Sequence, residues 1–208
     1  MEKILVISPH ADDGEFGCGG SIARFLEEGR EVFYVAFTTS EKSIPPGMPE
    51  NTHREELKKA MRTLGVKNEN ITVFKYDVRN FLTYRQEILE DLYRLGKEID
   101  PSLVFLPSPN DTHQDHQVIA QEGFRIFKRH TILGYEIPWN NLNFSTNAFV
   151  FIEERHLQKK IDTVGCYISQ RRRGYASSDF LRSLAKTRGT QIGVEYAEVF
   201  EVIRWVIR

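Results

Sequence analysis

Short apolar runs alternate with longer amphipathic segments along the first 130 residues. Four runs are mostly apolar: residues 4–7, 32–37, 71–76 and 103–106. Such runs are typical of strands buried on both faces of a parallel sheet. Four segments carry apolar side chains at helical spacing: residues 21–28, 52–64, 83–99 and 113–127. Strands that alternate with helices predict right-handed β–α–β units, and therefore an α/β protein whose mainly parallel sheet has helices on both faces.

The rest of the chain is less regular, but it continues the same pattern. Within the first 130 residues, capping boxes at Thr52-x-x-Glu55 and Thr83-x-x-Gln86 mark the starts of the predicted helices at 52–64 and 83–99. Beyond residue 130 we expect short strands and helices, with a closing strand suited to a sheet edge. The expected strands are residues 132–135, 148–152 and 199–207, and the expected helices are residues 155–167 and 179–187.

Length, charge and composition narrow the class of protein. At 208 residues, we expect a single domain over residues 1–208. Lys plus Arg is 28 and Asp plus Glu is 29, so there is no electrostatic footprint for bulk nucleic-acid binding. The chain has no apolar run near the ~20 residues of a membrane span, and its N-terminal run is too short for a signal peptide. Two cysteines, Cys18 and Cys166, make no disulfide framework, so we expect a cytoplasmic protein.

Histidine and aspartate gather in two segments, which follow the first and fourth predicted strands. In open α/β sheets, ligands bind outside the carboxyl ends of the strands, so these segments are expected to meet. His10, Asp13 and His116 offer two imidazoles and one carboxylate, a ligand set for catalytic zinc that leaves a fourth position for water. The plainer alternative is that the aspartates cap a helix and the histidines are solvated.

The neighbours of these ligands are candidates for acid–base chemistry. Asp12 is expected to point away from Asp13 and to act as general base for the bound water. His113 would flank the metal, where it could donate to an oxyanion or pass a proton to the leaving group. Asp115 is expected to orient and charge His113. Glu15 either holds the loop backbone or tunes the charge of the metal.

Several other features have less specific interpretations. The spacing of Gly14, Gly17, Gly19 and Gly20 does not match a dinucleotide-binding fingerprint, which favours close packing of the first helix on the sheet. Loop 44–51 is long enough for a lid, and equally for a plain surface loop.

Two aromatic and basic features bear on the substrate. Trp139 and Asn140 could stack on a sugar face and bond its hydroxyls, although core packing explains Trp139 equally well. The basic run, Arg171, Arg172 and Arg173, is either solvated surface or a phosphate contact suited to a nucleotide-linked sugar.

Three motifs together resemble the LmbE-like, or PIG-L-like, family of zinc-dependent de-N-acetylases. They are Pro9-His10-Ala11-Asp12-Asp13-Gly14-Glu15 followed by Gly17-Cys18-Gly19-Gly20, then His53-Arg54-Glu55-Glu56-Leu57, and His113-Gln114-Asp115-His116. The resemblance implies a Rossmann-like fold and one Zn²⁺ per chain. It also implies His10, Asp13 and His116 as ligands, Asp12 as base, His113 as the assisting group and Arg54 on the substrate. Many members have proline where this chain has Ala11 and Gln114.

The reaction that the resemblance implies is hydrolysis of an N-acetyl group from an amino-sugar derivative, either a glycoside or a nucleotide-linked sugar. Three alternatives stay open at this point. The chain could be a catalytically silent sugar- or nucleotide-sugar-binding domain. It could be a metal-dependent hydrolase of another bond, such as a phosphoester. The metal could be iron or cobalt instead of zinc. Apart from these alternatives, a homo-oligomer is compatible with the sequence.

Overall fold

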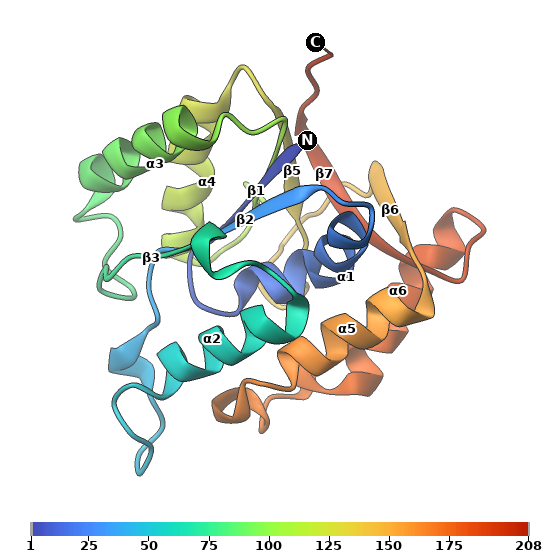
Figure 1. The fold of residues 1–208 in the computed structure, drawn as a ribbon, viewed down its shortest axis with the longest axis horizontal. Coiled ribbons are helices and arrows are strands. Elements are labelled where there is room, and N and C mark those ends of the chain that lie inside the picture. The colour runs from blue at the N-terminus through green and yellow to red at the C-terminus, as the bar shows by residue number, and fades with distance from the viewer. Residues whose placement is uncertain (1, 208) are drawn as a thin grey trace.

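The computed structural model describes residues 2–207, and its strands form a single seven-stranded sheet (Figure 1). The strands are β1 (Lys3–Ser8), β2 (Glu31–Ala36), β3 (Ile71–Val73), β4 (Leu103–Pro107), β5 (Thr131–Tyr135), β6 (Ala148–Ile152) and β7 (Tyr196–Arg204). Their order is β3-β2-β1-β4-β5-β7-β6, and the first five positions are joined by parallel pairing. The predicted mainly parallel α/β sheet is therefore confirmed.

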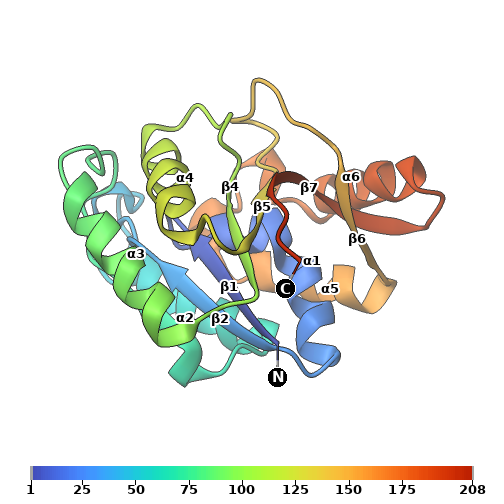
Figure 2. The same cartoon turned by 90° about the horizontal axis from the view of Figure 1, so that it is seen from above.

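Helices cover both faces of the sheet, as Figures 1 and 2 show. They are α1 (Asp13–Glu27), α2 (Thr52–Leu64), α3 (Arg85–Ile99), α4 (Gln114–Phe127), α5 (Glu154–Val164) and α6 (Ser178–Gln191). In β1, Ile4 and Val6 face the core beneath α1 and α2, while Leu5 and Ile7 face the core beneath α3 and α4. This two-sided burial explains why the strand is apolar throughout. None of the helices in residues 2–207 is long and apolar enough to cross a membrane.

The order in which strands are added to the sheet reverses after β3, so that β1 and β4 lie next to each other. From β1 the chain runs outward through β2 to β3, and it then crosses back to β4, which pairs with the other side of β1. The loops after β1 and β4 consequently open at one edge of the sheet, side by side. This is the switch point at which α/β sheets bind ligands.

The first helix begins earlier than the pattern predicts. It starts at Asp13 rather than at residue 21, and it bends at Cys18, where φ is −143° and ψ is 23°. Glycine has a low helix propensity, so the Gly-rich segment reads as a loop. In the structure it packs against the sheet: a Cβ on Gly17 would lie 2.4 Å from the Tyr135 ring, and one on Gly14 would lie 2.7 Å from the Tyr34 ring. The expected packing role of these two glycines is confirmed.

Other boundaries differ because tertiary contacts replace local signals. Strand β7 pairs with both β5 and β6 and is internal, so the expected edge position is wrong, and β6 forms that edge. The two predicted capping boxes are also wrong. The N-cap residues are Asn51 and Tyr84, while the hydroxyls of Thr52 and Thr83 donate to Pro49 O and Asn80 Oδ1 in the preceding turns.

Candidate metal centre and active site

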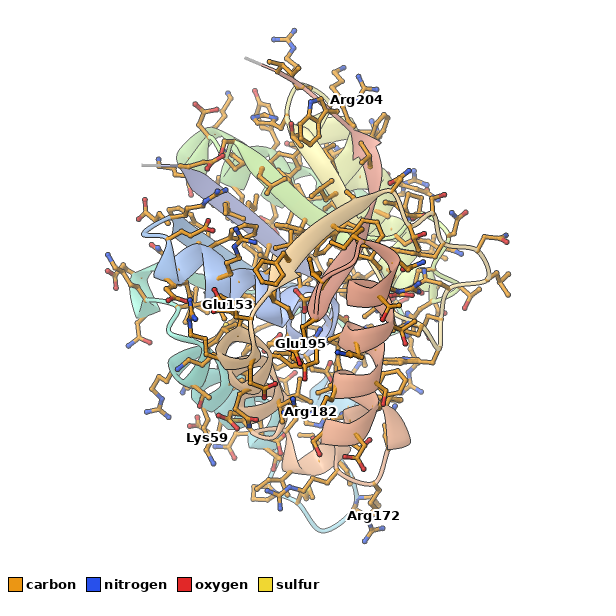
Figure 3. All side chains as sticks on the ribbon, turned by 90° about the vertical axis from the view of Figure 1, so that its right-hand side faces the viewer. Lys59, Glu153, Arg172, Arg182, Glu195 and Arg204 are labelled. Carbon is orange, nitrogen blue, oxygen red and sulfur yellow. The ribbon has the colours of Figure 1, made fainter. Side chains whose placement is uncertain are left out.

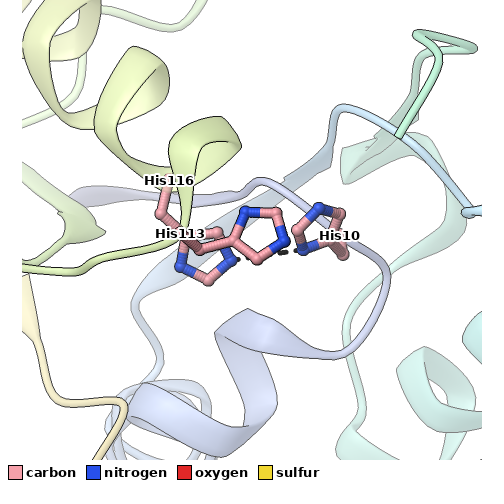
Figure 4. A group of neighbouring side chains, drawn as sticks. All are labelled: His10, His113 and His116. Atoms are coloured by element: carbon pink, nitrogen blue, oxygen red, sulfur yellow. Dashed lines mark hydrogen bonds between the residues drawn. The ribbon is translucent and has the colours of Figure 1, made fainter. Parts of the chain in front are cut away.

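Three donor atoms converge where the loops after β1 and β4 meet. Asp13 Oδ2 lies 3.0 Å from His10 Nδ1 and 3.1 Å from His116 Nε2, and the two nitrogens are 3.2 Å apart. Asp13 is in the first turn of α1 and His116 in the first turn of α4, whereas His10 lies on the loop after β1. His113 stands beside them, with its donor atom within 4.8 Å of those of the other two histidines (Figure 4).

The spacing of these atoms fits a tetrahedral cation site. With bonds of about 2.0–2.1 Å, the donor atoms around zinc lie roughly 3.3 Å from one another. The three observed separations of 3.0–3.2 Å match that value closely. The electrostatics agree, because Asp13, against the opposing effect of burial, raises the pKa of His10 to about 9 and that of His116 to about 10. The cluster therefore favours a positive charge at its centre.

A carboxylate contacts the ring of each of His10 and His116 on the side away from the centre of the cluster. His116 Nδ1 lies 2.7 Å from Asp111 Oδ2, and His10 Nε2 lies 3.0 Å from Asp115 Oδ2. Each contact assigns the hydrogen to the outer ring nitrogen, so that the inner nitrogen offers its lone pair to the centre. No role for Asp111 is predicted from the sequence, although it follows β4 in the same segment as His113 and His116.

The expected partner of Asp115 is wrong. Its carboxylate does not orient the ring of His113 but holds His10, and it accepts hydrogen bonds from the backbone N–H groups of Arg79 and Phe81 at 2.6 and 3.2 Å. Burial alone would raise the pKa of Asp115, but the bonds from His10 and Arg79 lower it below its ordinary value. Asp115 thus connects the turn at residues 77–80 to the metal centre.

Asp12 presents a carboxylate that no other side chain among residues 2–207 binds. It occupies the N-cap position of α1 but makes no side-chain cap bond, and within residues 2–207 its oxygens accept no side-chain hydrogen bond. Burial, and then the charge of Asp13, raise its pKa to about 6. A carboxyl group with such a pKa can both take and return a proton near neutral pH. The capping alternative for Asp12 is not what the structure shows.

His113 is held in one tautomer. Its Nδ1 accepts a hydrogen bond from the backbone N–H of Asp115 at 3.2 Å, which places the hydrogen of the neutral ring on Nε2. Burial, and then the charges of His10 and His116, lower the pKa of His113. The neutral ring therefore offers an N–H donor beside the metal centre.

Glu15 supports the loop through two tyrosines. The Tyr167 hydroxyl lies 2.5 Å from Glu15 Oε1 and 2.7 Å from the carbonyl of Ala11, and the Tyr34 hydroxyl also contacts both groups. Burial raises the pKa of Glu15 to about 8, despite these hydrogen bonds. Of the two interpretations of Glu15, the geometry favours loop support, because its bonds converge on the backbone next to Asp12.

A cavity of about 270 Å³ opens onto the metal centre. Trp139 and Asn140 line it, as does Tyr175, whose ring stacks on that of Trp139 with centroids 3.8 Å apart. The Trp139 side chain is exposed rather than packed in the core. The side-chain amide of Asn140 makes no hydrogen bond to another of the described residues. Both side chains are thus available to a ligand.

On α2, the cavity is lined by His53 and not by Arg54. The guanidinium of Arg54 is exposed and lies 3.5 Å from Glu41, outside the cavity. Adjacent helical residues point about 100° apart, so only one of the two can face the cavity. The Nδ1 atom of His53 lies 2.9 Å from the carbonyl of Thr39, while its buried Nε2 has no partner among residues 2–207. The placement of Arg54 in the site is therefore wrong, and sequence analysis missed His53.

Comparisons with known proteins agree with this geometry. The PIG-L (GlcNAc-PI de-N-acetylase) family model matches residues 5–127. A deacetylase of Escherichia coli, YaiS, described as uncharacterized, is 31% identical over 163 residues, which cover 76% of this chain and 86% of YaiS.

Solved structures share the fold of nearly the whole chain. The N,N′-diacetylchitobiose deacetylase of Pyrococcus horikoshii aligns with a TM-score of 0.81 and 24% identity, covering 97% of this chain and 84% of its own. A 4-carboxy-2-hydroxymuconate hydratase of Pseudomonas putida, GalB, aligns with a TM-score of 0.82 and 19% identity, covering 100% and 98%. The fold alone thus accommodates more than one reaction.

The fold and the site define a Rossmann-like α/β protein with a histidine–carboxylate cluster, which could hold a metal ion, at the switch point of its sheet. The family match extends over both segments that build this cluster. The chain belongs to the PIG-L, or LmbE-like, deacetylase family, and the resemblance seen in its motifs is confirmed.

Proposed function

We propose that this protein is a zinc-dependent hydrolase that removes the N-acetyl group from an N-acetylated amino-sugar derivative. One observation carries the proposal: the triangle of His10, Asp13 and His116 shares its cavity with the carboxylate of Asp12, which no other side chain of residues 2–207 binds. A binding module has no need of a free base beside a metal centre. Membership in a deacetylase family supports the choice of an acetamide as the group attacked.

His10, Asp13 and His116 would hold one Zn²⁺ per chain. A zinc ion at such a site polarises a carbonyl oxygen and lowers the pKa of water from about 16 to about 7. The three protein ligands leave a coordination position open, as catalytic zinc sites do. Asp111 and Asp115 would keep both histidines oriented whether or not the ion is present, because their bonds are made within the protein.

The protein groups around the cavity would move the protons of the reaction. Asp12 accepts a proton from the attacking water, whose oxygen forms a bond to the acetyl carbon. His113 donates its Nε2 hydrogen toward the oxygen on which negative charge develops. Asp12 or His113 then gives a proton to the nitrogen as the carbon–nitrogen bond breaks, so that acetate and a free amine leave.

The substrate side of the cavity suits a sugar. The ring of Trp139, supported by Tyr175, offers an aromatic surface, and Asn140 offers both hydrogen-bond donors and an acceptor. The vacant Nε2 of His53 adds an acceptor for a hydroxyl group. We therefore assign Trp139, Asn140 and His53 to the sugar.

Acetate release from a panel of N-acetylated sugars, free, glycosidic and nucleotide-linked, tests this function. We expect zinc-loaded protein to release acetate from at least one of them. Asp12→Asn should lower the rate at least ~100-fold, since it removes the acid–base group, while one zinc per chain is retained. Arg172→Gln is a matched surface control, because the Arg172 side chain points away from the molecule (Figure 3).

Two outcomes would contradict the proposal. Near-normal turnover by Asp12→Asn would show that Asp12 is not the general base. Binding of one zinc and of a sugar, without acetate release from any member of the panel, would favour the catalytically silent binding domain instead.

A further inference from the structure

Two arginines at the rim of the cavity have no acidic partner. Arg79 and Arg173 both line the cavity and are exposed, and neither forms an ion pair with a carboxylate in residues 2–207. Two other basic side chains near the cavity are paired, since Lys42 contacts Asp77 at 2.8 Å and Arg54 contacts Glu41 at 3.5 Å. Arg171 and Arg172, which also have no acidic partner among the described residues, do not line the cavity. The cavity thus presents two positive charges that the protein itself leaves unneutralised.

Each of these arginines is held in place by the site. Arg79 has a left-handed backbone, with φ of 66°, which non-glycine residues adopt at a cost of about 1 kcal/mol or more. Its backbone N–H donates to Asp115 Oδ2, the carboxylate that also holds His10. Residues with a left-handed backbone often occur at functional sites, and the backbone of Arg79 is bonded to a carboxylate of the candidate metal centre.

Arg173 is held by an aromatic side chain that also lines the cavity. Its Nη1 donates to the Tyr175 hydroxyl at 2.5 Å, and its Cζ lies 5.7 Å from the centroid of the same ring. Tyr175 in turn stacks on Trp139. Of the three consecutive arginines, Arg173 lines the cavity, whereas Arg171 and Arg172 do not. The basic run is therefore divided between one cavity residue and two surface residues.

We infer that the sugar substrate carries an anionic substituent, a carboxylate or a phosphate, which binds at the part of the cavity that Arg79 and Arg173 line. This inference rests on the proposed function and specifies its substrate class. The carboxylates that line the cavity, Asp12 and Asp13, belong to the metal centre, so they do not neutralise the rim. Guanidinium groups suit carboxylate and phosphate oxygens because they can donate two parallel hydrogen bonds.

Matched pairs of substrates test the inference. The carboxymethyl glycoside of N-acetylglucosamine is compared with its neutral carboxamidomethyl isostere, and N-acetylglucosamine 1-phosphate with the methyl glycoside. We expect kcat/KM to be at least ~10-fold higher for the anionic member of one pair, chiefly through KM. The pair that shows this preference distinguishes carboxylate from phosphate. The preference should shrink as the salt concentration rises.

Variants assign the preference to the two arginines. Arg79→Gln and Arg173→Gln should each lower the anionic-to-neutral ratio of kcat/KM about 10-fold, whereas Arg172→Gln should leave the ratio unchanged. Circular dichroism checks that the variants fold. An equal kcat/KM for both members of each pair, or an unchanged ratio in both cavity variants, would overturn the inference.

A binding measurement separates this inference from the proposed function. Calorimetry with Asp12→Asn gives dissociation constants without turnover. If the wild-type protein hydrolyses nothing, tighter binding of an anionic glycoside that Arg79→Gln abolishes would still support an anion site, while the deacetylase proposal would fail. Equal affinity for anionic and neutral glycosides would refute the anion site even if deacetylation occurs.

Discussion

At the scale of single residues, the site depends on which atom of each side chain is left free. His10 and His116 are both bonded through their outer nitrogens, so their inner nitrogens face the centre. His53 follows the same rule. Its Nδ1 is bonded to the carbonyl of Thr39, so the buried Nε2 is an acceptor that no protein group uses. A buried acceptor costs about 1–3 kcal/mol unless something pairs with it, which favours a ligand hydroxyl.

A pair of amide variants tests the role of His53. In Asn, the side-chain N–H can replace Nδ1 toward Thr39, but nothing replaces Nε2. In Gln, the longer side chain can replace the Nε2 acceptor. We expect His53→Asn to lower kcat/KM for the best sugar substrate about 10-fold, the worth of roughly one hydrogen bond to a buried group, and His53→Gln to lose less than about 3-fold. Equal losses in steady-state assays of the two variants would speak against an acceptor role.

At the scale of elements, the N-terminal half of α1 positions the catalytic loop by lying close to the sheet. Gly17 allows this approach, because the ring of Tyr135 fills the space where a side chain would project. Tyr135 is fully buried, and its hydroxyl donates to the carbonyl of Ile7 in β1 at 3.1 Å. The ring therefore has no room to move away from a methyl group.

Gly17→Ala should accordingly destabilise the protein. Overpacking costs typically 1–3 kcal/mol, and a Cβ only 2.4 Å from a buried ring favours the upper part of that range, about 2–3 kcal/mol. The better helix propensity of alanine offsets about 1 kcal/mol, so we expect a net loss of about 1–2 kcal/mol. Urea unfolding of metal-free protein measures this change. Gly174→Ala is the control, because nothing lies within 4 Å of its Cβ position, and its free energy of unfolding should change by less than about 0.5 kcal/mol. Unaltered stability of Gly17→Ala would show that α1 can shift.

At the scale of the whole molecule, the candidate metal centre joins two parts of the chain that are far apart in sequence. The inner nitrogens of His10 and His116 lie 3.2 Å apart across a separation of 106 residues. A cation bound there contacts both halves of the parallel sheet and binds only the folded chain. Its binding free energy therefore adds to the free energy of unfolding.

Metal removal should lower the melting temperature. At free zinc 100 times the dissociation constant, the stabilisation is about 2.7 kcal/mol, or roughly 5–10 °C for a chain of this size. Differential scanning calorimetry with and without a chelator measures it. Arg172→Gln should show the wild-type shift, and Asp13→Ala, which lacks a ligand, should show almost none. A wild-type melting temperature that does not respond to complete removal of bound zinc would contradict the assignment.

The architecture and the central residues of the site follow from local patterns in the sequence. Continuous apolar strands and amphipathic helices are local patterns, so the α/β sheet could be predicted from them, as could the meeting of the loops that carry His10, Asp13 and His116. The family could be identified from short motifs, and the family model matches the range that contains all of them. The roles proposed for these residues remain predictions until the experiments above are made.

Only the tertiary structure decided which side chains face the cavity and which neighbour each one contacts. Helical phase separates His53 from Arg54. The spacing of Leu57, Met61 and Leu64 places His53 on the buried face of α2, but only the tertiary structure shows that this end of the face meets the cavity. The carboxylate of Asp115 contacts His10 and the turn at residues 77–80, and only its backbone N–H contacts His113. The place of β7 inside the sheet is likewise set by its pairing with β5 and β6. Such contacts depend on the positions of distant elements, which no local pattern encodes.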